Sequence, residues 1–186
     1  ISLIEAVYRP LSRFDPQTTM KIGILSDIHG HETRLRAALD LLARHGAQAL
    51  VVCGDLGSSV VLRVLGESGL PAHAVAGNMD RPLADLDRLA AEAGVRFDWQ
   101  SLDVDLPRAR RLSVTHGHTH LLADLIDSQA YAYVCHGHTH RLADHRVGRT
   151  RVINPGALHH PRQPPYPTVA LLDTTLDKLE VLRVES

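Results

Sequence analysis

The stretch Lys21–Gly30, KIGILSDIHG, combines a short apolar run with a polar ending. Residues 21–26 have the length and composition of a buried β-strand, and Asp27 and His29 follow directly after it. The same arrangement returns at residues 49–55, which read ALVVCGD. Ionisable residues just beyond strand ends are typical of sites at the carboxyl edge of an α/β sheet. The first half of the chain therefore predicts an α/β fold with a site along one sheet edge.

Strand and helix patterns alternate outward from this stretch. Apolar residues at helical spacing predict helices at 31–45, at 58–67, from Pro82 onward and at 121–126. Further strands are predicted at 72–76, 102–106, 112–115, 131–135, 141–147, 151–153, 168–173 and 178–184. Such a pattern indicates two packed sheets with helices outside. With no interior linker, residues 20–186 are expected to form a single domain, preceded by an N-terminal extension at residues 1–19.

The composition favours an ordinary globular protein over a membrane protein or a binder of long nucleic acid. The 186 residues are 44% hydrophobic with a net charge of −1, which is ordinary for a globular protein and argues against long nucleic acid or an anionic membrane as partner. No run approaches the roughly 20 apolar residues of a membrane span, and the first nineteen residues do not resemble a signal peptide. Two cysteines without a secretory signal favour a reducing, cytoplasmic compartment. Thirteen histidines, mostly clustered, raise the expectation of bound metal.

Polar residues capable of binding metal follow five of the predicted strands. The candidates are Asp27, His29, Asp55, Asn78, His116, His138 and His140. Carboxylate oxygen, amide oxygen and imidazole nitrogen suit borderline divalent ions such as Mn, Fe, Zn, Ni or Co. Two metals need a bridging ligand, for which Asp55 is the candidate. The pentapeptide HGHTH occurs at 116–120 and again at 136–140, as expected if both preceding strands end at one site.

Five short motifs occur in an order that resembles the signature of the calcineurin-like metallophosphoesterases. They are Asp27-Ile28-His29, Gly54-Asp55, Gly77-Asn78-Met79-Asp80, His116-Gly117-His118 and Gly137-His138-Thr139-His140. The short chain and Asn154-Pro155-Gly156 are similar to the YfcE-type phosphodiesterase branch. Each motif alone is weak, but five in order, from about Met20 to the C-terminus, are specific. The resemblance implies a four-layer αββα sandwich of two mixed β-sheets flanked by helices.

The resemblance also implies two four-residue ligand sets that share Asp55. One divalent ion would be held by Asp27, His29, Asp55 and His140, and a second by Asp55, Asn78, His116 and His138. Manganese is the leading candidate, with Fe, Zn, Ni, Co or Mg as alternatives. A hydroxide bridging the two ions would attack phosphorus in a small phosphodiester. The resemblance allows a homo-oligomer.

Two departures from the family pattern bear on the chemistry. Many relatives carry a histidine where this chain has Met79, and that histidine can protonate the leaving group. His118 is the nearest alternative by motif and is the candidate catalytic residue. No arginine follows Gly54-Asp55, unlike in the Ser/Thr protein phosphatases of the superfamily, so protein phosphatase activity is disfavoured.

Other interpretations stay open at the level of sequence. The retromer subunit that shares this fold is a non-catalytic scaffold, although all seven positions here keep ligand-capable residues. A phosphomonoesterase or nucleotide phosphatase is the other alternative. Asp80 is expected either to orient a ligand histidine or to cap the helix at Pro82. His159 and His160 are interpreted as surface residues, and His31 as a surface residue with substrate contact as the alternative.

Overall fold

The computed structural model describes residues 20–185, in which helices and strands alternate over the first half and strands predominate in the second. The strands are β1 (Lys21–Leu25), β2 (Ala49–Val52), β3 (Ala72–Val75), β4 (Arg96–Asp98), β5 (Ser101–Leu106), β6 (Arg110–Thr115), β7 (Tyr133–Cys135), β8 (Leu142–Val147), β9 (Thr150–Pro155), β10 (Thr168–Asp173) and β11 (Lys178–Arg183). The helices are α1 (Glu32–Arg44), α2 (Val60–Glu67), α3 (Leu86–Ala93) and α4 (Leu121–Asp127). The predicted extension at residues 1–19 lies outside the described residues.

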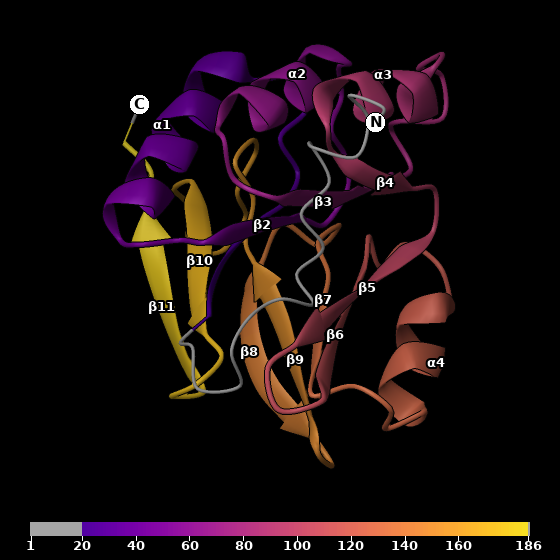
Figure 1. Cartoon of the computed structure of the whole chain (residues 1–186), viewed down its shortest axis with the longest axis vertical. Coiled ribbons are helices and arrows are strands. Elements are labelled where there is room, and N and C mark those ends of the chain that lie inside the picture. The colour runs from indigo at the N-terminus through magenta and orange to yellow at the C-terminus, as the bar shows by residue number, and fades with distance from the viewer. Residues whose placement is uncertain (1–19, 186) are drawn as a thin grey trace, which may run out of the picture.

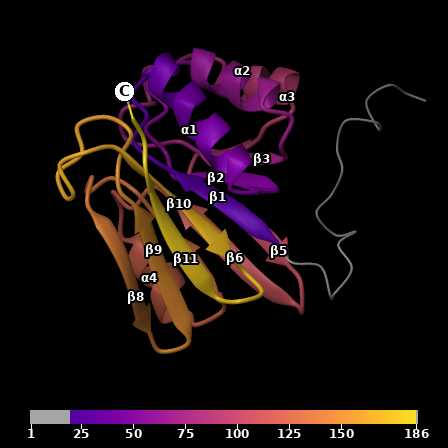
Figure 2. The same cartoon turned by 90° about the vertical axis from the view of Figure 1, so that its left-hand side faces the viewer.

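The strands of this described region form two mixed sheets that pack face to face. The first has the order β11-β10-β1-β2-β3-β4 and the second β5-β6-β7-β9-β8. In the first sheet β1 is parallel to β2 but antiparallel to β10, and in the second β6 is parallel to β7 but antiparallel to β5. Helices α1, α2 and α3 lie on the outer side of the first sheet, and α4 lies beside β6 and β7 (Figures 1 and 2). The predicted αββα sandwich is confirmed.

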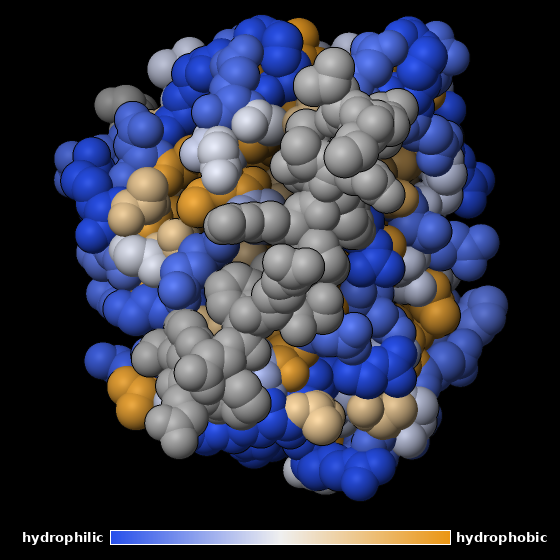
Figure 3. Space-filling model, in the orientation of Figure 1, coloured by the Kyte–Doolittle hydropathy of each residue, from blue (hydrophilic) through white to orange (hydrophobic). Residues whose placement is uncertain are grey.

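Strand β1 is apolar from Ile22 to Leu25 because both of its faces are covered. Ile22 and Ile24 are fully buried between the two sheets, whereas Leu25 is buried on the helix side. Gly23, between Ile22 and Ile24, allows helix α1 to pack close to the strand, since a Cβ there would lie 2.8 Å from Leu42 Cδ1. A continuous apolar run is what a strand buried on both faces requires. The margins of the face shown in Figure 3 are mostly hydrophilic.

Two elements differ from the sequence prediction. The helix expected from Pro82 begins only at Leu86, because Asp85 adopts a left-handed conformation (φ 59°) that helical residues do not share. Strand β4 was not predicted at all; its three residues are too few to show an alternating pattern, and its pairing with β3 defines it. Among residues 20–185, no helix combines the length and the apolar character needed to cross a bilayer.

Strand β3 carries a buried histidine that should make stability depend on pH. The His73 side chain is 7% exposed, and neither ring nitrogen has a hydrogen-bond partner among the described residues. Burial, with a smaller contribution from Arg96 on the paired strand, lowers the pKa of His73 to about 4. The unfolded chain takes up a proton below a pKa of about 6.5, whereas the folded chain does so only near 4. The free energy of unfolding should therefore fall as the pH falls through this window.

We expect His73→Val to reduce this pH dependence. Between pH 7 and pH 5 the wild-type protein should lose about 2 kcal/mol more stability than the variant. Urea unfolding at both pH values, with a chelator present so that metal loss plays no part, measures the difference. An equal loss of stability in the two proteins would contradict the assignment.

Candidate metal centre

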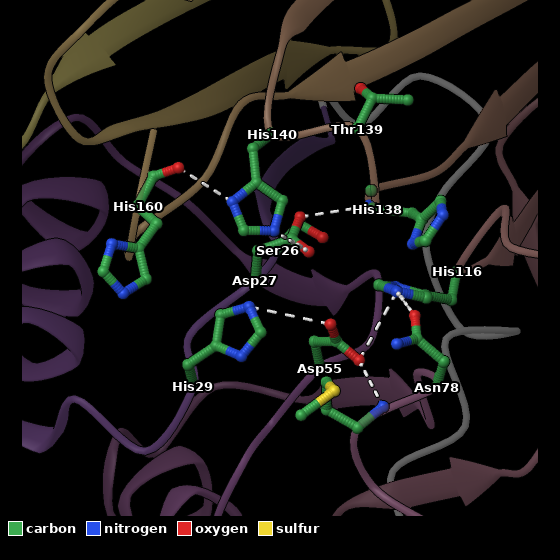
Figure 4. Close-up of polar contacts among 12 residues, drawn as sticks. Ser26, Asp27, His29, Asp55, Asn78, His116, His138, Thr139, His140 and His160 are labelled. Carbon is green, nitrogen blue, oxygen red and sulfur yellow. Dashed lines mark hydrogen bonds and ion pairs between the residues drawn. The ribbon is translucent and has the colours of Figure 1, made fainter. Parts of the chain in front are cut away.

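All seven predicted ligands lie in loops that leave the carboxyl ends of strands from both sheets. Asp27 and His29 follow β1, Asp55 follows β2 and Asn78 follows β3, while the remaining three follow β6 and β7 of the second sheet: His116, His138 and His140. Figure 4 shows their side chains converging on one region. The structure thus brings together residues that lie up to 113 positions apart in the sequence (140 − 27).

Four of these residues form a compact group of ligand atoms. Asp27, His29, Asp55 and His140 each offer one atom, and these atoms all lie within 4.8 Å of one another. The His140 Nε2 atom is 3.2 Å from Asp27 Oδ1, and His29 Nε2 is 3.6 Å from Asp55 Oδ2. Both carboxylates are almost completely buried. This group has the composition of the first ligand set that the resemblance implied.

The second set lies on the other side of Asp55. His116 Nε2 is 3.4 Å from Asp55 Oδ1 and 3.1 Å from Asn78 Oδ1. The ring of His138 lies 5.2 Å from the ring of His116, measured between centroids. Asp55 therefore directs one carboxylate oxygen toward each set, which is the arrangement required of a shared ligand.

Backbone carbonyls orient two of the imidazoles toward the site. The Nδ1 atom of His116 lies 2.7 Å from the carbonyl oxygen of Cys53, and Nδ1 of His140 lies 2.8 Å from that of His160. A carbonyl can only accept, so each Nδ1 must carry the hydrogen, and each Nε2 then presents a lone pair when the ring is neutral. Metal-binding histidines in proteins are commonly held in this way.

Unsatisfied buried atoms show that the residues fit a divalent cation. Asp27 Oδ1 and His29 Nε2 are buried and form no hydrogen bond among the described residues. The 3.2 Å approach of His140 to Asp27 Oδ1 lacks hydrogen-bond geometry. Leaving such atoms unpaired is costly, and a cation bound between them would satisfy both. Their oxygen and nitrogen chemistry matches Mn, Fe, Zn, Ni or Co.

Protons and metal ions would compete for the same atoms. Burial favours the neutral forms of both Asp55 and His116, but their mutual contact outweighs it: the pKa of Asp55 is lowered and that of His116 is raised. Asp27 raises the pKa of His140 in the same way. The carboxylates that raise these pKa values do so by stabilising the imidazolium form. Each ring must lose that proton before it can bind a cation.

Five of the seven residues adopt the left-handed backbone conformation. The φ angles are 54° at Asp27, 48° at His29, 52° at Asp55, 67° at His138 and 57° at His140. Positive φ is uncommon outside glycine and costs of order 1–3 kcal/mol per residue. Such strain is retained where the surrounding structure imposes it, and it clusters at functional sites.

Two glycines allow the ligand loops to approach one another. A Cβ on Gly77 would lie 2.0 Å from Asp55 Oδ1, and a Cβ on Gly137 would lie 1.8 Å from Ser26 Oγ. Neither contact is possible between real atoms. Only glycine therefore fits before Asn78, where Asp55 lies close, and before His138, where Ser26 lies close.

The Asp80 carboxylate fastens the β2 loop to the β3 loop. It is fully buried and accepts hydrogen bonds from the backbone N–H groups of Leu56 (3.0 Å), Gly57 (2.8 Å) and Gly77 (2.7 Å). This is neither of the roles expected from the sequence. The side chain bonds no ligand histidine in the described structure, and α3 begins too late for Asp80 to cap it. Asp80 instead holds Asp55 and Asn78 in register.

Asn154, near the end of β9 in the second sheet, plays a corresponding part. Its buried amide donates to the carbonyl of Gly137 (2.8 Å) and to Thr139 Oγ1 (3.1 Å), and its Oδ1 accepts from the N–H of Gly156. It thereby supports the loop that carries His138 and His140. The sequence marks Asn154 only as part of the Asn-Pro-Gly motif and does not reveal this supporting role.

The neighbours of the ligands occupy distinct positions. The His118 ring lies 5.3 Å from the His116 ring and 6.1 Å from the His138 ring, and its buried Nδ1 has no partner among residues 20–185. Burial lowers the pKa of His118, with the cations around it acting in the same direction. His120 is exposed at the start of α4. Met79 is 56% exposed, and its backbone N–H donates to Asp55 Oδ1.

Comparison with known proteins gives a consistent result. The family model for the calcineurin-like phosphoesterase superfamily domain matches residues 20–177. The chain is 30% identical over 159 residues to phosphodiesterase MJ0936 of Methanocaldococcus jannaschii, covering 83% of this chain and 93% of the relative. It is 32% identical over 112 residues to phosphodiesterase YfcE of Escherichia coli K12, which spans 53% of this chain and 58% of that protein.

Solved structures agree with this assignment. A structure described as a novel archaeal phosphodiesterase superposes with a TM-score of 0.78 at 28% identity, covering 88% of this chain and 99% of the other. The family expected from the five motifs is therefore confirmed. The chain belongs to the calcineurin-like phosphoesterase superfamily.

Proposed function

We propose that the protein is a binuclear metal-dependent phosphodiesterase that hydrolyses small phosphodiesters. The observation that carries the proposal is the position of Asp55, whose two oxygens face separate groups of ligand atoms at 3.6 Å and 3.4 Å. Relatives named as phosphodiesterases support the same reaction class. A single-metal site would not need a carboxylate placed between two sets.

The seven residues would hold two ions. Asp27, His29 and His140 would hold one, Asn78, His116 and His138 the other, and Asp55 would contact both. Bound divalent ions would supply a water nucleophile that is deprotonated near neutral pH and would offset the charge on the phosphoryl oxygens. Manganese leads among the candidates, with Fe, Zn, Ni, Co or Mg as alternatives that these ligands accept.

His118 is proposed as the catalytic residue that hydrogen-bonds the leaving group or supplies its proton. It stands beside His116 and His138 without being one of the ligands, and Met79 cannot take this role. We expect His118→Gln to reduce hydrolysis of an alkyl diester about 10²–10³-fold but that of bis(p-nitrophenyl) phosphate less than about tenfold. The nitrophenolate leaves without needing a proton, so the two substrates separate the roles.

Steady-state kinetics with both diesters would measure the effect. His120→Gln is the matched control, because that exposed histidine belongs to the same HGHTH segment and should affect neither substrate. An equal loss with both diesters would exclude leaving-group assistance by His118.

The test of the overall proposal is an activity screen after metal reconstitution. The protein is stripped with a chelator, reloaded with each ion in turn and assayed on diesters, monoesters and nucleotides, with metal content measured in parallel. We expect diester hydrolysis that depends on about two ions per chain, with manganese among the activating ions. Bound metal with no hydrolysis would favour the scaffold alternative, and preference for monoesters would favour the phosphatase alternative.

The proposal includes a cytoplasmic location and self-association. Cys53 and Cys135 are free and buried, as expected in a reducing compartment. Self-association is proposed from the resemblance to short members of the family. Size-exclusion chromatography with light scattering would test it.

A further inference from the structure

A second group of basic side chains lies next to the metal centre, on the side of His29. His31 precedes helix α1, Arg34 lies in its first turns, and His159 lies in the loop after β9. The ring of His159 is 5.5 Å from that of His31 and 5.9 Å from that of His29. His159, interpreted from the sequence as a surface residue, is thus only partly exposed and adjoins a predicted ligand.

Backbone contacts fix the position of this group. The N–H groups of Leu158 and His159 donate to the carbonyls of Ser26 (3.1 Å) and Asp27 (2.9 Å), so the loop is bound to the end of β1. The Arg34 guanidinium donates through Nη1 to the carbonyl of Leu158 at 2.7 Å. Arginine and imidazole are therefore held at the edge of the metal centre by the same strand end that carries Asp27.

The side chains around His159 are mainly basic. The rings of His29, His31 and His160 lie 5.9, 5.5 and 3.9 Å from its ring, and Arg34 donates to the carbonyl of the preceding residue, Leu158. Glu32, the acid nearest in sequence, instead pairs with Arg36 and Arg63. The N-terminus of α1, a 13-residue helix, adds partial positive charge at the same place.

Two nitrogen atoms in this group form no hydrogen bond within the described part of the chain. They are Nε of Arg34 and Nδ1 of His159, and both are buried. Donors that converge with permanent positive charge and no paired carboxylate suit a phosphate oxygen, for which arginine provides charge-assisted hydrogen bonds.

We propose that His31, Arg34 and His159 form a subsite for a second phosphate group of the substrate. The preferred substrates would then be phosphodiesters that carry an additional phosphate close to the scissile one, such as phosphorylated nucleotide esters. The inference rests on the proposed function, because it assumes that the scissile phosphodiester binds at the metal centre.

A pair of substrates differing only in the second phosphate tests the subsite. Thymidine 5′-(p-nitrophenyl phosphate) is compared with the same compound carrying a 3′-phosphate, using the metal-loaded protein. We expect kcat/KM to be at least about tenfold higher for the phosphorylated compound. Equal kcat/KM values for the two compounds would overturn the proposal.

Variants test whether Arg34 and His159 cause the preference for the substrate with the second phosphate. Arg34→Gln and His159→Asn should each bring the ratio of the two kcat/KM values toward one, and Arg34→Lys should retain part of the preference. Arg44→Gln, in the last turn of the same helix, is the control and should keep the wild-type ratio. A full preference in both Arg34→Gln and His159→Asn would also overturn the proposal.

Calorimetry separates failure of the subsite from failure of the proposed function. Thymidine 3′,5′-bisphosphate should bind the wild-type protein at least about tenfold more tightly than thymidine 5′-phosphate, but not the Arg34→Gln variant. If neither nitrophenyl ester were hydrolysed, the proposed function would fail, and this difference in affinity would still support the subsite. Equal affinities for the two nucleotides would reject it.

Discussion

Replacing Asp55 by asparagine is expected to lower kcat/KM for phosphodiester hydrolysis by at least about 10³-fold. Asparagine keeps the size of the side chain but has one oxygen instead of two. Asp55 faces His29 through one oxygen and His116 through the other, so the variant cannot serve both ligand sets. The negative charge of Asp55, which would offset that of bound cations, is lost as well. Metal analysis of the same protein should show fewer than two tightly bound ions per chain.

The control for this prediction is Asp105→Asn. Asp105 is an exposed carboxylate on β5 in the second sheet, so its loss should leave both metal content and activity unchanged. An Asp55→Asn protein that kept full metal-dependent activity would refute the shared-ligand role and, with it, the binuclear mechanism.

Asp80→Ala is expected to lower the free energy of unfolding by about 3–6 kcal/mol. The substitution leaves the N–H groups of Leu56, Gly57 and Gly77 without their acceptor. Each buried donor that loses its partner costs roughly 1–3 kcal/mol, less where water can enter. The β2 and β3 loops would also separate, so metal affinity should fall together with stability.

Urea unfolding followed by circular dichroism measures the stability change. Asp40→Ala removes an exposed carboxylate from α1 and should change the free energy of unfolding by less than about 0.5 kcal/mol. Asp80→Asn should lie between the two, because the amide oxygen still accepts while the amide nitrogen faces donors. An Asp80→Ala protein as stable as the Asp40→Ala control would show that the three N–H groups find other partners.

Much of the fold was predictable from local patterns. Apolar runs such as residues 22–25 predict strands buried on both faces, and the helical spacing of leucines predicts α1. The start of α3 could not be predicted, because Pro82 is compatible with a first helical turn while the left-handed Asp85 depends on its surroundings. Strand β4 was missed because its three residues become a strand only by pairing with β3.

The candidate site shows the same division. The identities and order of Asp27, His29, Asp55, Asn78, His116, His138 and His140 are properties of the sequence, and they were enough to predict the family that the comparisons confirm. The supporting contacts were not predictable. The sequence indicates for Asp80 either the orientation of a ligand histidine or the capping of a helix, and it indicates no role for Asn154.

The sequence by itself determined which side chains lie at the ends of strands. Apolar side chains repeat every two residues in a strand and every 3.6 in a helix, so the end of each element can be read from its own residues. Only the tertiary structure decided which of those side chains meet. Asp80 reaches Leu56 across 24 residues, the N–H of His138 reaches Asp27 across 111, and Arg34 reaches Leu158 across 124. Such contacts depend on how two sheets pack and how far glycines let their loops approach. No local pattern encodes these distances.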